Sequence, residues 1–131
     1  MKPIGRGTRT AIWLATWATA FVVTHLPPSE PPAQPLINDK LLHFTGFTAL
    51  GVLTAWRHAD VLRPISRRLM VFWLLVLIAY GFADEVTQEL VRRSFEWFDW
   101  VADGIGAAFG ISVGAACHYW SIRTQESKPD V

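Results

Sequence analysis

Three short groups of ionisable residues interrupt an otherwise apolar chain, and their residue types can do chemistry. They lie in the segments NDKLLHF, YGFADEVTQEL and FDWVADGIG. The groups contribute Asp39, Lys40 and His43, then Asp84, Glu85, Gln88 and Glu89, and then Asp99 and Asp103. Carboxylates and an imidazole can exchange protons with a substrate, and they are ligands of Mg²⁺, Mn²⁺ or Zn²⁺. A divalent metal ion is therefore compatible with these groups, although the spacing fits no established metal-ligand signature.

The spacing within each group places its members on one face of a helix, because residues three or four apart are neighbours there. The pairs so spaced are Asp39 and His43, Glu85 and Gln88, and Asp99 and Asp103. We expect the three faces to form one pocket. Its candidate catalytic residues are His43, Glu85 and Asp99. Its candidate ligand-binding residues are Asp39, Lys40, Gln88, Arg93 and Asp103.

Several of these residues also have purely structural interpretations. Asp39 and Asp99 each stand at the start of an apolar stretch and could simply cap a helix. His43 could be a hydrogen-bonded core residue. The adjacent arginines Arg92 and Arg93 suit a phosphate or a carboxylate, but they could instead balance the many nearby acids. The residue types alone leave these alternatives open.

The elements that position the polar groups are apolar and long. Hydrophobic residues make up 51% of the chain and charged residues 18%, and the mean hydropathy is +0.25, which favours a membrane protein over a small soluble one. Four apolar stretches lie at about 10–26, 41–56, 69–88 and 100–120. The second and third are short for a bilayer unless their polar ends are also helical, and we count those ends as helix. We expect one all-α domain over residues 1–131, a bundle of four transmembrane helices.

The distribution of Lys and Arg sets the expected orientation. Nine of the twelve basic residues fall at the termini and between the second and third stretches. Only Lys40, Arg92 and Arg93 fall on the other side. The positive-inside rule then puts both termini in the cytoplasm and the polar groups at the external face. The first stretch could also be a secretory signal, but residues 27–35 contain five prolines and no small-residue cleavage motif, so we favour an uncleaved span.

Small residues form a stripe along the last apolar stretch. Gly106, Gly110 and Gly114 are four apart and share one helical face. Such a stripe lets another helix approach closely, either from within the chain or from a second chain. The single cysteine, Cys117, excludes an intrachain disulfide.

The motifs DK-x-x-HF, DE-x-x-Q, R-S-F and D-x-x-x-D-x-x-G-A-x-x-G follow one another between Asp39 and Gly110. In this order and spacing the chain resembles the VanZ-like family of membrane proteins. Two departures are Val91 and Arg92 in place of a typical Pro-Gly, and Asp103 where asparagine is frequent. The resemblance implies that the family motif is carried by Asp39, Lys40, His43, Glu85, Gln88, Arg93 and Asp99. It also implies a multi-pass protein of the bacterial inner membrane, with a role like that of the prototype, an accessory factor in resistance to the antibiotic teicoplanin.

These observations lead to three hypotheses about function. The first is an external polar pocket that binds or acts on a cell-envelope component, such as a lipid-linked phosphate or a peptidoglycan precursor. The second is a non-enzymatic accessory protein that partners with another envelope protein. The third is a structural network that only locks helix ends together. Membrane lipid is an expected partner under all three, and a net charge of +1 gives no reason to expect nucleic acid. The family name does not decide whether the protein is an enzyme.

Overall fold

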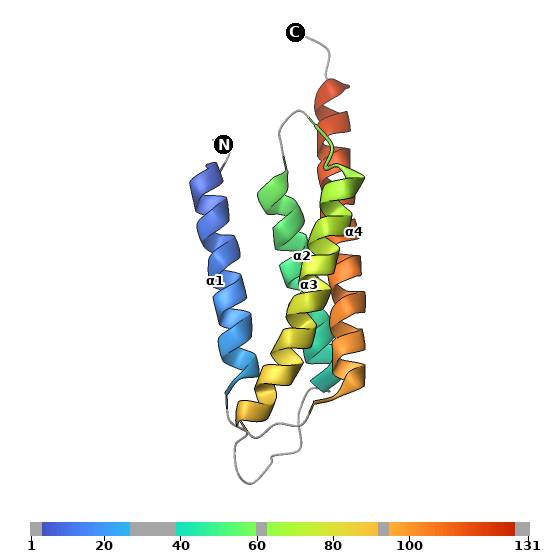
Figure 1. Cartoon of the computed structure of the whole chain (residues 1–131). Helices are drawn as coiled ribbons and strands as arrows, with labels where there is room; N and C mark the ends of the chain where they lie inside the picture. The colour runs from blue at the N-terminus through green and yellow to red at the C-terminus, as the bar shows by residue number, and fades with distance from the viewer. Residues whose placement is uncertain (1–3, 27–38, 60–62, 92–94, 128–131) are drawn as a thin grey trace.

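The computed structural model describes residues 4–26, 39–59, 63–91 and 95–127, and these residues are almost entirely helical. The elements are α1 (Arg6–Thr24), α2 (Asp39–His58), α3 (Arg67–Gln88), the short 3₁₀ helix η1 (Glu89–Val91) and α4 (Trp97–Glu126). The four α-helices lie side by side and alternate in direction, so that the start of α1 and the end of α4 lie at the same end of the bundle (Figure 1). The prediction of an all-α bundle with four helices is confirmed.

The helices are longer than the apolar stretches that predicted them. The second helix extends over Asp39–His58 and the third over Arg67–Gln88, so the polar ends are helical as expected. The side chain of Ser66 accepts a hydrogen bond of 3.3 Å from the backbone N–H of Leu69 and so caps the start of α3. At about 1.5 Å per residue, the 20 residues of α2 span roughly 30 Å, the thickness of the hydrocarbon core of a bilayer.

Among the described residues, two helices are long and apolar enough to cross a membrane, namely Arg67–Gln88 and the segment Trp97–Gln125 of α4. Helices α1 and α2 do not meet the same criterion of length and hydropathy. For α1, Arg9 and five threonines lower the mean hydropathy of its 19 residues. The composition of α3 and α4 thus supports a membrane protein with two membrane-crossing helices among the described residues.

The glycine stripe of α4 packs against α2 of the same chain. A Cβ atom added to Gly106, Gly110 or Gly114 would overlap with Phe44, Thr48 or Ala55, respectively. The two backbones are therefore in direct contact, as small residues at a helix interface permit. The stripe serves intramolecular packing, the first of the two alternatives. A helix from another chain has no free surface at these glycines, because α2 covers them.

The distribution of side chains differs from that of a soluble helical bundle. The buried hydrophobic core of the described residues is small, with Phe47, Leu50, Leu77, Ala107 and Ile111 at its centre. Seven polar side chains are buried as well, at His43, Thr54, Asp84, Glu85, Gln88, Asp99 and Asp103. Large apolar side chains are exposed along α1, α3 and α4, for example Leu14, Leu75 and Phe109, whereas in α2 they are exposed only at Leu41 and Leu42 near its start. Apolar surface of this extent calls for contact with lipid or with other protein.

Candidate functional site

Six of the eight predicted site residues lie together at the end of the bundle where α2 and α4 begin and α3 ends. We call this group, with Glu96 added, the histidine cluster: Asp39, Lys40, His43, Glu85, Glu96, Asp99 and Asp103. The antiparallel arrangement of the helices brings it together, because it places the N-terminal turns of α2 and α4 beside the C-terminal turn of α3 (Figure 1). The convergence that the sequence predicted is therefore observed for these six residues.

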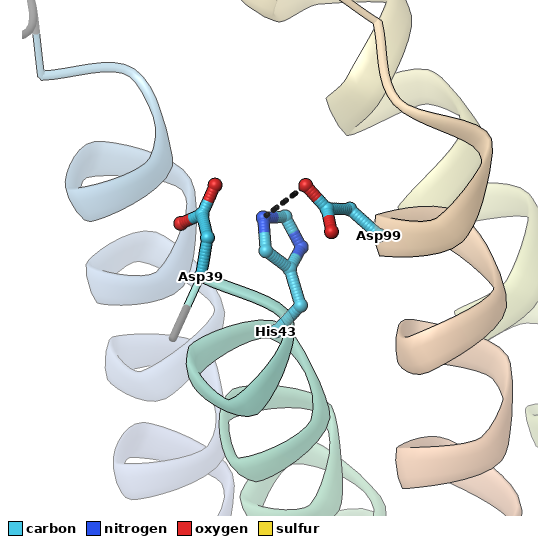
Figure 2. Close-up of side chains that lie close together, drawn as sticks. All are labelled: Asp39, His43 and Asp99. Atoms are coloured by element: carbon cyan, nitrogen blue, oxygen red, sulfur yellow. Dashed lines mark ion pairs between the residues drawn. The ribbon is translucent and has the colours of Figure 1, made fainter. Parts of the chain in front are cut away.

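The imidazole of His43 lies at the centre of the cluster and is 7% exposed. Its Nδ1 is 3.0 Å from Oδ1 of Asp103 and 3.8 Å from Oε1 of Glu85. Its Nε2 is 4.0 Å from Oδ2 of Asp99. Figure 2 shows the ring between the carboxylates of Asp39 and Asp99. One imidazole thus faces carboxylates from three helices.

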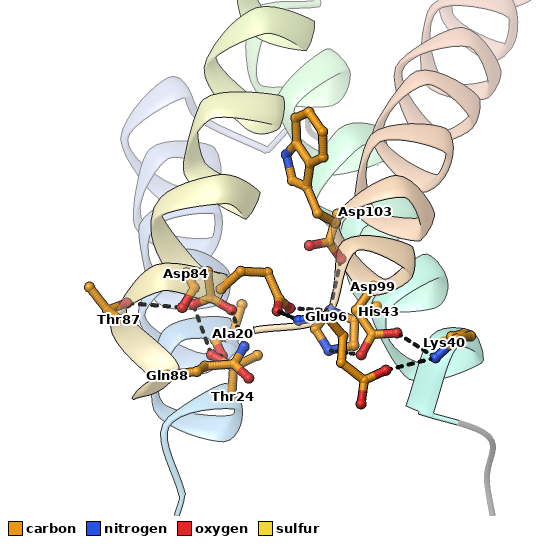
Figure 3. Close-up of polar contacts among 12 residues, drawn as sticks. Ala20, Thr24, Lys40, His43, Asp84, Thr87, Gln88, Glu96, Asp99 and Asp103 are labelled. Carbon is orange, nitrogen blue, oxygen red and sulfur yellow. Dashed lines mark hydrogen bonds and ion pairs between the residues drawn. The ribbon is translucent and has the colours of Figure 1, made fainter. Parts of the chain in front are cut away.

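The outer edge of the cluster is formed by Lys40. Its Nζ donates hydrogen bonds of 3.1 Å to Oε2 of Glu96 and 3.1 Å to Oδ1 of Asp99, as Figure 3 shows. The side chain of Lys40 is 45% exposed, whereas that of Asp99 is 4% exposed. Lys40 therefore connects the solvent-facing edge with the buried carboxylate of Asp99.

Glu96 was not predicted as a site residue, yet it organises the cluster. Its backbone N–H donates a hydrogen bond of 3.0 Å to Oε2 of Glu85, and its side chain accepts one from Lys40. It stands at the N-cap position of α4 without a side-chain capping bond. A signal was present in the sequence, because Glu96 lies one helical turn before Asp99.

Two carboxylate oxygens of the cluster are buried and have no hydrogen-bond partner among the residues that the structure describes. They are Oε1 of Glu85 and Oδ2 of Asp103, in residues that are 1% and 0% exposed. The carboxylate of Asp103 fits against α3 because Gly81 has no side chain there. A Cβ atom added to Gly81 would lie 3.0 Å from Oδ2 of Asp103. Buried carboxylate oxygens are costly without a proton, a water molecule or a cation beside them. The arrangement thus has the capacity to hold a positive group between α2, α3 and α4.

A second polar group joins α1 to α3 and includes Gln88, one of the predicted ligand-binding residues. Thr24 donates a hydrogen bond of 2.9 Å to Oδ1 of Asp84, and Gln88 donates one of 3.0 Å to Oδ2 (Figure 3). His25 lies within hydrogen-bond distance of Thr87, at 2.9 Å between Nε2 and Oγ1. We call these five residues the Asp84 cluster. Both carboxylate oxygens of Asp84 are hydrogen-bonded, which is the pattern of a structural network.

The remaining predicted site residue, Arg93, lies outside the described residues, as does its neighbour Arg92. Asp39 and His43 of α2 and Asp99 of α4 have ligand atoms within 4.8 Å of one another, and so have His43, Glu85 and Asp103. His43 belongs to both groups. Either group has enough nitrogen and oxygen ligands to bind a divalent metal ion.

A cavity of about 220 Å³ extends from the histidine cluster between α1 and α2. Its polar end is formed by Asp39 and His43, and its walls by Thr16, Thr19, Ala20, Val23, Thr24, Leu42, Gly46, Phe47 and Ala49. A larger cavity of about 470 Å³ lies at the opposite end of the bundle, beside Arg9, Cys117 and His118. Only the smaller one reaches the histidine cluster. The cavity is apolar along most of its length and polar at one end, so its shape and chemistry match an amphiphile.

A comparison of the chain with family models, with curated proteins and with solved structures finds no match.

Proposed function

We propose that this chain is a VanZ-like integral membrane protein with four spans, and that its histidine cluster faces the external leaflet of the bacterial inner membrane. In this proposal both termini are cytoplasmic, as the positions of Lys and Arg indicate. Support for further spans comes from the large apolar side chains exposed along α1 as well as along α3 and α4, and from Leu41 and Leu42 at the start of α2. Helices α1 and α2 have 19 and 20 residues, close to the length that a bilayer needs.

The proposed function is to bind or act on an amphiphilic cell-envelope component, with a lipid-linked phosphate or a peptidoglycan precursor as the chemical class. One observation carries this proposal, namely the apolar cavity between α1 and α2 that ends at Asp39 and His43. A hydrocarbon chain in this cavity would place its headgroup beside the histidine cluster. Lys40 would then contact the headgroup at the exposed edge, and His43, Glu85 and Asp99 would orient it or exchange protons with it.

The Asp84 cluster favours a structural role for part of the polar network. Thr24 and Gln88 satisfy both oxygens of Asp84, and His25 pairs with Thr87 across the contact between α1 and α3. These residues join two helix ends, and both carboxylate oxygens of Asp84 accept hydrogen bonds within the network. The binding proposal therefore rests on the histidine cluster, while Gln88 is assigned to the structure.

The proposal is tested by binding of a fluorescent polyprenyl monophosphate to the purified protein in nanodiscs. Substitution Gly46→Leu fills the cavity without a clash at its Cβ, since nothing lies within 4 Å of that position. We expect it to weaken binding by at least about tenfold, which corresponds to ~1.4 kcal/mol. The control is Gly7→Leu, where an added Cβ also meets open space but which does not line the cavity.

Equal binding by the wild-type protein and Gly46→Leu would refute a lipid chain in the cavity. Failure of the wild-type protein to bind the polyprenyl phosphate would refute the proposed ligand class. A Gly7→Leu variant that loses as much affinity as Gly46→Leu would also count against the proposal, because the loss would then not be specific to the cavity.

A further inference from the structure

The histidine cluster contains more buried negative charge than its described cations can balance. Glu85, Asp99 and Asp103 are each at most 3% exposed. The only lysine in the cluster, Lys40, pairs with Asp99 and with the exposed Glu96. Ionised groups at this depth are expensive unless they are paired or bind a metal ion. A cation close to Glu85 and Asp103 would therefore stabilise their ionised carboxylates.

The positions of the unpartnered oxygens indicate where that cation lies. Within the described ranges, Oε1 of Glu85 has no hydrogen-bond partner, and it is 3.8 Å from Nδ1 of His43. Asp103 approaches the same nitrogen to 3.0 Å with Oδ1, while its Oδ2 also has no partner in those ranges. Ligand atoms at about 2.0–2.2 Å from one metal ion are roughly 2.8–3.6 Å apart for tetrahedral or octahedral angles. The two distances from Nδ1 of His43 need shifts of only a few tenths of an ångström to meet this requirement.

We propose that Nδ1 of His43 and the carboxylates of Glu85 and Asp103 bind one divalent transition-metal ion, of the Mn²⁺ to Zn²⁺ range. The ligand atoms of these three residues lie within 4.8 Å of one another, and all three residues are buried. One nitrogen and two carboxylates form a mixed ligand set that suits Mn²⁺ or Zn²⁺ better than Mg²⁺, which prefers oxygen ligands. A 2+ ion would also neutralise the two carboxylates.

The alternative group of Asp39, His43 and Asp99 is less suited to the ion. Asp99 already accepts a hydrogen bond from Lys40, and a metal ion beside it would lie close to that ammonium. Asp99 instead acts as a positioning residue. Its Oδ2 is 4.0 Å from Nε2 of His43, and a small shift would let it accept that N–H. A carboxylate in this position orients a metal-binding imidazole and fixes its tautomer.

A metal ion at this place would explain how the histidine cluster binds an anionic headgroup. This part of the inference rests on the proposed function. The histidine cluster has more carboxylates than cations among the described residues, so an anionic headgroup would be repelled. A metal ion held by Glu85 and Asp103 would provide the positive charge that a phosphate oxygen requires. The presence of the ion itself is tested without any lipid.

The experiment uses the full chain in nanodiscs, stripped with a chelator and titrated with Mn²⁺ or Zn²⁺ alone. The wild-type protein should bind one ion per chain. His43→Ala, Glu85→Gln and Asp103→Asn should each weaken binding by at least about a hundredfold. Asp99→Asn should weaken it by about 10- to 100-fold, as expected of a residue that only orients a ligand. In the wild-type protein, pulsed electron paramagnetic resonance of bound Mn²⁺ should show coupling to one imidazole nitrogen.

Two carboxylates outside the proposed ligand set provide matched controls. Asp84→Asn removes a buried carboxylate of the neighbouring cluster, and Glu89→Gln removes an exposed one. Both variants should bind the ion as the wild-type protein does. Circular dichroism of all variants shows whether they remain folded, and the nitrogen coupling tests the site even if a variant does not fold.

The inference is overturned if the wild-type protein binds no ion, if bound Mn²⁺ shows no nitrogen coupling, or if folded Glu85→Gln and Asp103→Asn variants bind like the wild type. Polyprenyl phosphate binding without any metal ion would refute the role of the ion toward the lipid and leave the proposed function standing. A protein that binds the metal ion but not the lipid would support the metal site and refute the proposed function.

Discussion

Substitution Gly51→Ala should destabilise the bundle by forcing α2 away from α4. A Cβ at this position would lie 2.7 Å from the carbonyl oxygen of Ala107 and 2.8 Å from the backbone nitrogen of Ile111. Ordinary contacts of a Cβ atom begin at 3.4 Å, so one backbone must move by about 0.7 Å, the difference between 3.4 and 2.7 Å. Both neighbours are backbone atoms of a helix and cannot rotate aside. The whole of one helix must therefore shift or tilt.

The expected magnitude follows from two opposing effects. Overpacking of a tight interface costs ~1–3 kcal/mol, whereas replacing glycine by alanine inside a helix gains up to ~1 kcal/mol. Gly46 lies in the same helix and an added Cβ there meets nothing within 4 Å, so Gly46→Ala should show the gain alone. The difference between the two variants isolates the overpacking. At roughly 4 °C per kcal/mol for a chain of this size, Gly51→Ala should melt about 4–12 °C below Gly46→Ala.

The assay is thermal unfolding of both variants and the wild-type protein in the same detergent, followed by circular dichroism. A Gly51→Ala variant that melts at or above the temperature of Gly46→Ala would refute the close contact between α2 and α4. It would also remove the reason to place His43 of α2 beside Asp103 of α4, since the contact of these helices sets that distance.

Two further predictions concern the orientation in the membrane and the contact between α1 and α3. The orientation is tested in a Cys117→Ser background with a membrane-impermeant maleimide. The reagent should label Glu89→Cys in cells with a permeable outer membrane, but Ser127→Cys only after lysis. The reverse pattern would refute the proposed orientation. Thr24→Val should lower stability by ~1–3 kcal/mol, because it leaves a buried oxygen of Asp84 without its donor, and chemical unfolding measures this loss. The control is Thr16→Val, because the hydroxyl of Thr16 donates to the carbonyl oxygen of Ile12 in the same helix. This variant should change stability by less than ~0.5 kcal/mol. Equal losses for Thr24→Val and Thr16→Val would contradict the contact between Thr24 and Asp84.

Much of the candidate site was predictable because helical spacing is a local property. Asp39 and His43 are four apart and so share a face of α2, and Asp99 and Asp103 do the same on α4. The short connections expected between antiparallel helices then place these faces at one end of the bundle. Gln88 shows the limit of this reasoning. It shares a helical turn with Glu85, but its side chain is directed to Asp84.

The partners of individual atoms could not be predicted, because they depend on how each helix is rotated about its axis. The structure pairs His25 with Thr87 of another helix, at 2.9 Å between Nε2 and Oγ1. Glu96 was not among the predicted site residues, yet its backbone N–H donates a hydrogen bond to Oε2 of Glu85. These contacts join residues that are 62 and 11 positions apart, so no local pattern reveals them.

The sequence by itself determined the helical elements, the polar ends that continue them and the glycine stripe of α4, because periodicity and hydropathy act within one segment. Only the tertiary structure decided that α2 covers the stripe, that Asp84 is satisfied, and that oxygens of Glu85 and Asp103 are not. The physical reason is that burial and hydrogen bonding are properties of packed pairs of helices. The carboxylate oxygens without a partner among the described residues therefore become apparent only when the helices are assembled.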